Sequence, residues 1–364
     1  MENQDDWGPS SAFAAIVTWR HPPPVPLLRS LLDRTLSGTP PLTYPPWVTL
    51  PGARLQTAYS SWDYWYMQAS PPRQGADPGS QRVARIILQA AAIHLTPVTL
   101  ELGGKCPCLI SEEVDILAAA HRLAWAKFFN TGQSCVAPDY VLCSQATCDA
   151  LLPALQQTLE DFYTKDPQKC PDLGRIISDR HWTRLTDLLQ KSQGRVVLGG
   201  QSNQSEKYFA PTVIVDVKED DALMEEEIFG PILPILTIES LEEGISFINR
   251  KEKPLALYVF SDKSSVVTKV LEQTSSGGFC SNDGIVHMTL PGLPFGGVGA
   301  SGWGSYHGRW GFETFSHRRS CMLRGWALER INTLRYPPYQ ENNLGWLRWT
   351  ISPKKNVFNN CSLM

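Results

Sequence analysis

A carboxylate and a thiol stand 34 residues apart, in two segments whose composition suits acyl transfer. Glu101 lies in TLELGGKCPC (99–108), a strand-like run followed by two glycines. Cys135 lies in NTGQSCVAPDY (130–140), a polar turn that contains a glycine. A cysteine that forms an acyl intermediate needs a base for the later hydrolysis, and Glu101 is the candidate base. Such a turn also lets backbone N–H groups converge on one point, as an oxyanion site requires.

Each of these two residues also has a plain structural interpretation. A cysteine taken alone is more often an inert buried residue than a nucleophile. Glu101 would have no chemical role if its strand alternated and placed it on the solvated face. In an otherwise apolar strand, however, a carboxylate costs free energy unless it is paired or used, and burial raises its pKa toward the range of a general base. The longer motifs favour the chemical interpretation.

The two segments resemble the active-site segments of aldehyde dehydrogenases, most closely the class 3 family and its B-type members. Two further segments, EEIFGPILPI (226–235) and LPFGGVGASGWG (293–304), strengthen the resemblance. LRYPPY (334–339) resembles the class 3 C-terminal region. The resemblance covers about residues 79–340. It implies an α/β fold with an aldehyde-dehydrogenase-like catalytic domain built on a parallel sheet, together with an incomplete Rossmann-type cofactor domain.

The implied reaction is the NAD- or NADP-dependent oxidation of an aldehyde to a carboxylic acid. The substrates would be medium- or long-chain aliphatic or aromatic aldehydes. Cys135 would carry the thioester and Glu101 would activate water. In the EEIFG segment, Glu227 would contact the nicotinamide ribose and Phe229 would lie beside the nicotinamide ring. Because class 3 members are typically dimers, the resemblance also implies a homodimer or a heterodimer with a full-length relative.

The cofactor half of the family pattern is incomplete. No lysine occurs before Lys105, and the only asparagine before Asn130 is Asn3. The family's lysine that holds the adenosine ribose, and its oxyanion-binding asparagine, therefore have no counterpart in residues 1–78. We expect a chain that is weakly active or inactive as a dehydrogenase. A thiol esterase and a silent dimer partner are the alternatives.

Part of the family's cofactor turn is kept as Gly79 and Ser80, which are predicted cofactor-binding residues. Ala84 stands where the family usually has glycine. Its added methyl group is expected to hinder the close approach of a dinucleotide to this helix.

Amino-acid composition also distinguishes the first 78 residues from the rest of the chain. The first 78 residues hold 13 of the 28 prolines and 5 of the 12 tryptophans, without a sustained helical or strand period. This segment is expected to be poorly ordered, or else an irregular domain stabilised by its aromatic residues. The predicted organisation is an atypical segment 1–78, a remnant of the cofactor domain 79–105, a catalytic domain 106–312, a C-terminal return and dimerisation segment 313–340 and a membrane-anchoring tail 341–364.

Strand-like and helix-like runs alternate through the catalytic region, which favours an α/β domain with a largely parallel sheet. Leu117, Trp125 and Phe128 are predicted to lie on the buried side of the second helix. The predicted helices span 81–94, 114–129, 241–250 and 264–271, with a further one marked by apolar residues between 151 and 162. The predicted strands span 98–102, 140–143, 195–198, 212–217, 232–238 and 257–260.

The chain ends Cys361-Ser362-Leu363-Met364, which fits the pattern for prenylation of Cys361, with the final methionine favouring farnesyl. Lys354 and Lys355 lie upstream and would help one prenyl chain hold a membrane. A chance terminal cysteine is the alternative. The motif predicts attachment to a cytoplasmic membrane face or a lipid droplet.

Composition argues against several other classes of function. The net charge of −3 gives no general attraction to nucleic acid. Acidic residues at the N-terminus do not suit a signal peptide, and nine cysteines without pairing rhythm fit free thiols in a reducing cytosol. Cys106-Pro107-Cys108 lacks nearby partners for a zinc site, so no metal is expected.

Overall fold

The computed structural model describes residues 53–59, 63–69, 81–323, 325–326 and 329–351. The chain divides into two units, Met1–Ser316 and His317–Met364. The predicted cofactor residues Gly79 and Ser80 and the predicted lipidation residue Cys361 lie outside the described residues, as does most of the segment 1–78.

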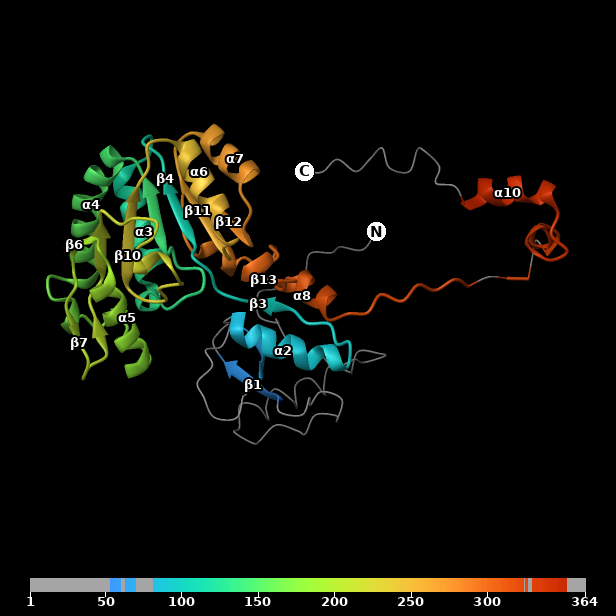
Figure 1. Cartoon of the computed structure of the whole chain (residues 1–364), viewed down its shortest axis with the longest axis horizontal. Helices are drawn as coiled ribbons and strands as arrows, with labels where there is room; N and C mark the ends of the chain where they lie inside the picture. The colour runs from blue at the N-terminus through green and yellow to red at the C-terminus, as the bar shows by residue number, and fades with distance from the viewer. Residues whose placement is uncertain (1–52, 60–62, 70–80, 324, 327–328, 352–364) are drawn as a thin grey trace, which may run out of the picture. The chain divides into compact units, whose positions relative to one another are not determined.

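A seven-stranded sheet forms the centre of the first unit (Figure 1). The strand order is β12-β11-β4-β5-β10-β9-β6, and all neighbours are parallel except β6, which is antiparallel to β9. The predicted α/β class and largely parallel sheet are confirmed. The bounds are β4 (Pro107–Ile110), β5 (Tyr140–Cys143), β6 (Arg195–Leu198), β9 (Thr212–Val215), β10 (Ile232–Thr237), β11 (Ala256–Phe260) and β12 (Gly278–Ser281).

A strand that is covered by helices on both faces has an almost continuous run of apolar residues. Such runs are the signal by which strands of this sheet were predicted from the sequence. Every residue of β5, β9 and β11 is buried. Strand β4 is equally buried but has only four residues and begins with proline, so its pattern did not predict a strand. Strand β12 was also missed, because its glycine, cysteine and serine give no strand signal.

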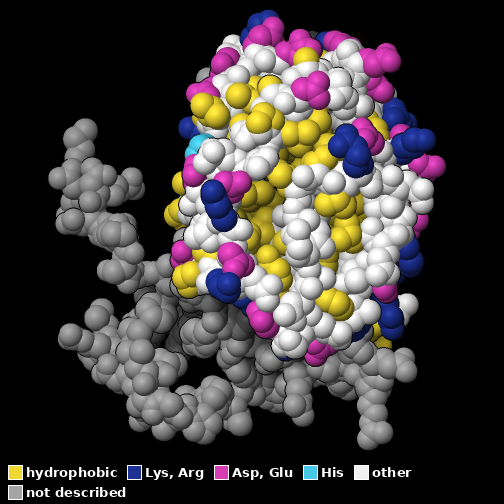
Figure 2. Space-filling model, turned by 90° about the vertical axis from the view of Figure 1, so that its left-hand side faces the viewer, with side chains coloured by type: hydrophobic (Ala, Val, Ile, Leu, Met, Phe, Trp, Pro, Cys, Tyr) yellow, Lys and Arg dark blue, Asp and Glu magenta, His cyan; other side chains and the backbone are white. Residues whose placement is uncertain are grey.

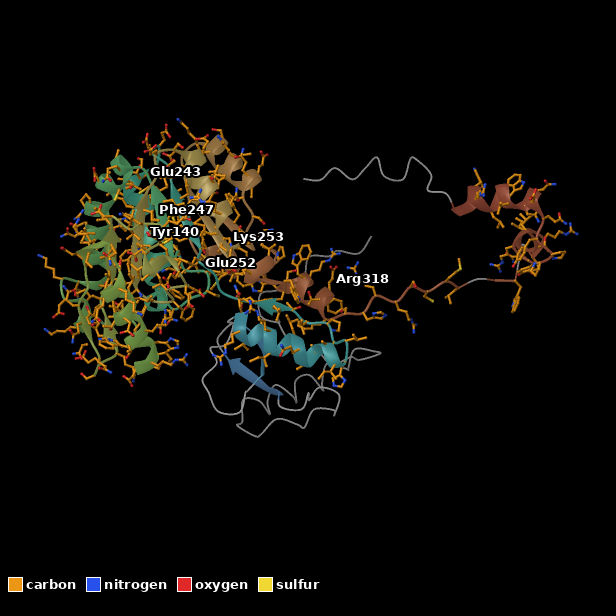
Figure 3. The ribbon with its side chains drawn as sticks, viewed as in Figure 1. Tyr140, Glu243, Phe247, Glu252, Lys253 and Arg318 are labelled. Atoms are coloured by element: carbon orange, nitrogen blue, oxygen red, sulfur yellow. The ribbon has the colours of Figure 1, made fainter. Side chains whose placement is uncertain are left out.

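Helices cover both faces of the sheet. Helices α3 (Ile116–Phe128) and α4 (Gln145–Tyr163) pack on one face. Helices α5 (Asp179–Lys191), α6 (Leu241–Arg250) and α7 (Ser264–Gln273) pack on the other. Tyr140 of β5, for example, packs against Phe247 of α6 with ring centroids 5.8 Å apart (Figure 3).

Helix α3 begins at Asp115, whose side chain accepts hydrogen bonds from the N–H groups of Leu117 and Ala118. The prediction that Leu117 and Trp125 are buried is wrong, since they are 60% and 40% exposed, whereas Phe128 is buried as expected. The helix instead buries its small residues, which let its backbone approach the sheet closely and turn the larger side chains outward. These buried residues are Ala119, Ala120, Ala124 and Ala126, with Leu123 among them.

The segment before β4 is joined to the catalytic region through a short strand. Strand β3 (Leu100–Glu101) pairs antiparallel with β13 (Gly302–Trp303), so that Glu101 lies opposite Gly302. Helix α2 (Gln81–Ile93) buries Ala84 against β3. The sequence also contains a hairpin that was not predicted, formed by β1 (Ala53–Tyr59) and β2 (Asp63–Ala69).

The remaining elements are short. They are β7 (Ser202–Asn203), β8 (Tyr208–Phe209), α8 (Gly308–Thr314) and, in the second unit, α9 (Glu329–Asn332) and α10 (Glu341–Ile351). Figure 2 shows apolar side chains reaching the surface between charged ones, and Val196 of the edge strand β6 is 43% exposed. None of the described helices has the length and apolar character needed to cross a bilayer.

Candidate active site

Cys135 lies in a tight turn, Asn130–Ala137, which we call the nucleophile turn. It follows α3 directly and opens with three consecutive residues at positive φ, Asn130 (50°), Thr131 (58°) and Gly132 (72°). A Cβ at Gly132 would lie 2.2 Å from the carbonyl oxygen of Gly230, so only glycine permits this contact. The turn is therefore built around a close approach to the Glu226–Gly230 loop.

Gln133 fastens the nucleophile turn to the segment that precedes α5. Its Nε2 donates to the carbonyl oxygens of Asn130 and Arg175, each at 3.0 Å. Its Oε1 accepts from the N–H of Ile177 at 2.9 Å. A single amide side chain thus satisfies backbone groups in two segments.

Glu101 and Cys135 meet in the structure. The Cys135 thiol donates a hydrogen bond to the Glu101 carboxylate. Burial, then the charges of Glu101 and Glu227, raise the pKa of the Cys135 thiol well above its ordinary value. The thiol therefore stays protonated at neutral pH, and Glu101 is the hydrogen-bonded base that can take its proton.

One backbone N–H of the nucleophile turn, next to the thiol, has no acceptor among the described residues. The turn is closed by the N–H of Ala137, which donates to the carbonyl of Ser134 at 3.0 Å. Within the part of the chain that the structure describes, the N–H of Cys135 has no acceptor. It is free to donate to an oxyanion that forms on a substrate bound at the sulfur.

The Glu226–Gly230 loop carries the predicted residues Glu227 and Phe229. A Cβ at Gly103 would lie 2.0 Å from Oε2 of Glu227, so the carboxyl occupies space that only glycine leaves open. Burial, followed by the charge of Asp139, raises the pKa of Glu227 to about 8, although the N–H of Gly104 donates to its carboxyl. Phe229 has a φ of 44° and is 36% exposed, so the loop presents an aromatic ring at the surface.

A buried ion cluster links this loop to the nucleophile turn. Asp139, only 3% exposed, pairs with Lys105 at 2.5 Å and lies 3.9 Å from Lys127. It also accepts from the N–H of Ile228 at 3.1 Å. Burial lowers the pKa of Lys127 to about 8. No local signal in the sequence indicates a role for these residues, although Lys105 and Asp139 stand inside the ELGGK and APDY motifs.

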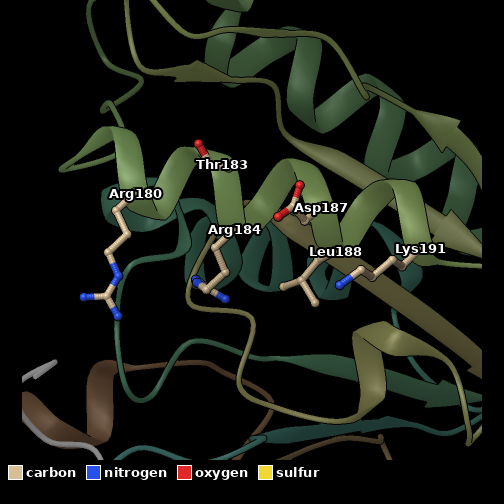
Figure 4. Close-up of a pocket in the computed structure, with 6 residues that line it drawn as sticks. All are labelled: Arg180, Thr183, Arg184, Asp187, Leu188 and Lys191. Atoms are coloured by element: carbon tan, nitrogen blue, oxygen red, sulfur yellow. The ribbon is translucent and has the colours of Figure 1, made fainter. Parts of the chain in front are cut away.

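Arg184 of α5 holds the same loop from the opposite side. Its Nη2 donates to the carbonyl of Ile228 at 2.6 Å and to that of Phe229 at 3.5 Å, and its Nη1 reaches the carbonyl of Glu227 at 3.5 Å. Arg184 also lines an open pocket of about 400 Å³ along α5 (Figure 4). No local motif marks this arginine in the sequence.

The positions of the predicted site residues can be compared with the structure. Glu101 and Glu227 both act on Cys135, and Phe229 lies on the same loop as Glu227, whereas Gly79 and Ser80 lie outside the described residues. Among the described residues, no group of three or more histidine, cysteine, aspartate or glutamate side chains could hold a metal ion.

The profile of the aldehyde dehydrogenase family matches residues 78–321. This chain belongs to the aldehyde dehydrogenase family. It is 60% identical over 269 residues to human aldehyde dehydrogenase family 3 member B1, covering 74% of this chain and 57% of that protein. It is 55% identical over 271 residues to human member B2, covering 74% of this chain and 70% of that protein. The predicted class 3, B-type resemblance is confirmed.

The fold agrees with these relatives. The substrate-bound structure of the Staphylococcus aureus enzyme AldH matches with a TM-score of 0.69 and 43% identity, over 75% of this chain and 59% of that one. The chain thus spans little more than half the length of the first relatives it matches.

Proposed function

We propose that this chain oxidises aldehydes to carboxylic acids through a thioester on Cys135, with NAD or NADP as the oxidant. The observation that carries the proposal is the hydrogen bond between the Cys135 thiol and the Glu101 carboxylate. A nucleophile and a base in contact, beside an open backbone donor, are the minimum set for acyl chemistry on cysteine.

The reaction would run as follows on this chain's residues. The Cys135 sulfur attacks the carbonyl carbon while its proton passes to Glu101. The N–H of Cys135 donates to the oxygen that becomes negative. NAD or NADP, which Glu227 and Phe229 would help to hold, would supply the acceptor for the hydride lost from the substrate carbon, so that Cys135 would keep the acyl group as a thioester. Glu101 next gives up that proton to solvent and takes a proton from water, whose oxygen attacks the thioester. The acid leaves, and the proton on Glu101 returns to the Cys135 sulfur.

The residues of the Glu226–Gly230 loop fit the nicotinamide end of a dinucleotide. Glu227 offers a carboxyl with a pKa of about 8, which suits a hydrogen bond to a ribose hydroxyl, and Phe229 offers a partly exposed ring. Both cofactor types occur among solved relatives, since one is described as an NAD-dependent aldehyde dehydrogenase and another as an NADP-dependent enzyme.

Medium- or long-chain aliphatic or aromatic aldehydes are the proposed substrates. Trp125 and Phe129 are 40% and 45% exposed, and their ring centroids lie 5.6 Å apart. They stand at the end of α3, where the chain enters the nucleophile turn. An apolar surface at this place supports an apolar substrate.

The proposed setting is a cytoplasmic membrane face or a lipid droplet, reached through a prenyl group on Cys361. The terminal CSLM sequence is the support for this proposal. Apolar aldehydes partition into lipid, so an anchored enzyme would meet them at high local concentration. We also propose a dimer, either of two copies or with a full-length relative.

A second function, the hydrolysis of activated esters without a cofactor, is favoured by one observation. The nucleophile and the base come from residues 101–135 and need no dinucleotide to meet. Ester cleavage would use the same attack and the same water activation, with an alcohol leaving in place of hydride. A chain unable to do either would act as a silent dimer partner.

The test uses the full chain with octanal and NAD or NADP, and separately with p-nitrophenyl acetate alone. We expect NAD(P)H formation that is weak, because the family's lysine and asparagine have no counterpart in residues 1–78, and that falls to the background rate in Cys135→Ala. The matched control, Cys321→Ala, removes an exposed thiol of the second unit and should leave turnover unchanged. Ester cleavage without NAD(P)H formation would favour the second function. A folded protein inactive in both assays would leave only the silent partner.

A further inference from the structure

Two buried side chains fix the peptide groups that follow the nucleophile. The Cys106 thiol donates to the carbonyl oxygen of Cys135 at 3.4 Å. The hydroxyl of Tyr258 donates to the carbonyl oxygen of Val136 at 2.5 Å. Both side chains are fully buried. Consecutive carbonyls of the nucleophile turn are therefore held by donors from two different places in the sheet.

Each of these two side chains also accepts a hydrogen bond from a backbone N–H. The Cys106 sulfur accepts from the N–H of Ala256 at 3.4 Å, and the Tyr258 oxygen accepts from the N–H of Ile285 at 3.4 Å. Cys106 immediately precedes β4, and Tyr258 is the middle residue of β11, which pairs with β4. The two donors are thus anchored in neighbouring central strands, the most rigid part of this fold.

Both groups remain donors over the whole working pH range. Burial raises the pKa of the Cys106 thiol and of the Tyr258 phenol well above their ordinary values. A thiolate or a phenolate could not donate to a carbonyl, so burial preserves these two hydrogen bonds.

We propose that Cys106 and Tyr258 are positioning residues, which hold the nucleophile turn so that the Cys135 sulfur faces Glu101 and the Cys135 N–H faces the site of oxyanion formation. The inference deepens the proposed function and rests on Cys135 being its nucleophile. An oxyanion donor must be aligned before the reaction, because reorienting it during the reaction costs rate. A turn that opens with three residues at positive φ would relax without such support.

The test measures the rate at which iodoacetamide alkylates Cys135, by mass spectrometry of the Cys135 peptide between pH 7 and 10. The titratable groups that act on this thiol are Glu101, Glu227 and Cys106. In Tyr258→Phe and Cys106→Ala, the loosened turn should expose the thiol, lower its pKa and speed alkylation. A fall of one unit in the pKa of Cys135 should raise the alkylation rate at pH 8 about tenfold.

Conservative and matched variants separate positioning from packing. Cys106→Ser keeps a donor and should retain the wild-type alkylation profile. Cys108→Ala removes an equally buried thiol from β4, and Tyr140→Phe removes a hydroxyl from a buried tyrosine of β5. Within the part of the chain that the structure describes, neither control side chain hydrogen-bonds to the nucleophile turn, so the Cys135 profile should stay unchanged even if stability falls.

A turnover measurement adds a second readout. In the positioning variants, kcat for acid formation should fall about tenfold with little change in KM for the aldehyde, less than the 10²–10³ expected when an oxyanion donor is lost outright. Failure of wild-type turnover would count against the proposed function alone, because alkylation needs no cofactor. If Tyr258→Phe and Cys106→Ala fold and keep the wild-type alkylation profile, the two side chains only fill the core and the proposal is wrong.

Discussion

The nucleophile turn and the Glu226–Gly230 loop touch each other, yet they are supported in different ways. The nucleophile turn is held from beneath by fully buried groups of the central strands, Cys106 and Tyr258. The Glu226–Gly230 loop is held by the buried Asp139, which accepts from the N–H of Ile228, and by the half-buried Arg184, which reaches over from a surface helix. The loop therefore depends in part on a half-buried side chain of the surface.

This division suits the chemistry proposed for each part. A nucleophile and its oxyanion donor gain rate from rigid alignment. A loop that receives a dinucleotide must admit and release it, and such segments are drawn from the less stable parts of a structure. Asp139, which lies two residues beyond the nucleophile turn, connects the two regions because it accepts from the N–H of Ile228 in the loop.

The largest loss of stability is expected from a substitution at Asp139. Asp139→Asn removes the anion and leaves Lys105 and Lys127 without their partner, and the loss of a buried ion pair member costs about 3–5 kcal/mol. Both regions should then exchange their amide hydrogens faster. Urea denaturation and hydrogen exchange check this prediction. Asp166→Asn, in an exposed pair with Lys169, should cost less than about 1 kcal/mol. Equal losses in the two variants would contradict the bridging role of Asp139.

A smaller effect, confined to one region, is expected from Arg184→Ala. The loop loses hydrogen bonds from a charged donor to the carbonyls of residues 227–229, and its amide exchange should rise about tenfold. Residues 133–137 should exchange as before. Arg180→Ala, one turn earlier and lining the same pocket, is the control and should leave both segments unchanged. Faster exchange in the nucleophile turn as well would show that the two regions are not supported separately.

A third effect, confined to alkaline pH, concerns the pH dependence of stability. Because the folded-state pKa of Glu227 is about 8, against an ordinary value of about 4.5, the folded protein binds this proton more tightly than the unfolded chain. Its contribution to stability is present at acidic pH and is lost as pH rises between these two values. Glu227→Gln should therefore raise the urea midpoint at pH 8.5 but hardly at pH 5.

The control for that measurement is Glu226→Gln, which removes a charge from the exposed neighbouring side chain. Its urea midpoint should differ from wild type by a similar small amount at both pH values. If Glu227→Gln also shifts the midpoint equally at pH 5 and 8.5, the Glu227 carboxyl is not held in its neutral form by burial.

The sequence predicted the strands β5, β9, β10 and β11 and proposed the catalytic pair, because each of these is encoded in a short local segment. Continuous apolar runs such as ALYVF (256–260) can only be buried strands or helix pieces, and their length favours strands. Residues whose role depends on a distant partner were missed. Nothing near Arg184 in the sequence indicates that it binds a loop 44 residues away, and Tyr258 gave only a strand signal.

The exposed side chains of α3 show the same limit of prediction from sequence. Periodicity alone predicted that Leu117 and Trp125 face the core, because large apolar residues usually do. The structure turns them outward, since a stripe of alanines allows closer packing on the sheet.

The sequence by itself determined the family and the largely parallel sheet and predicted a nucleophile and its base, because these depend on short segments with fixed local geometry. Tertiary structure alone decided that Glu101, paired to β13, meets Cys135 and that Cys106 and Tyr258 support the nucleophile turn. These contacts join residues far apart in the chain, and only the packing of the strands fixes which side chains face one another.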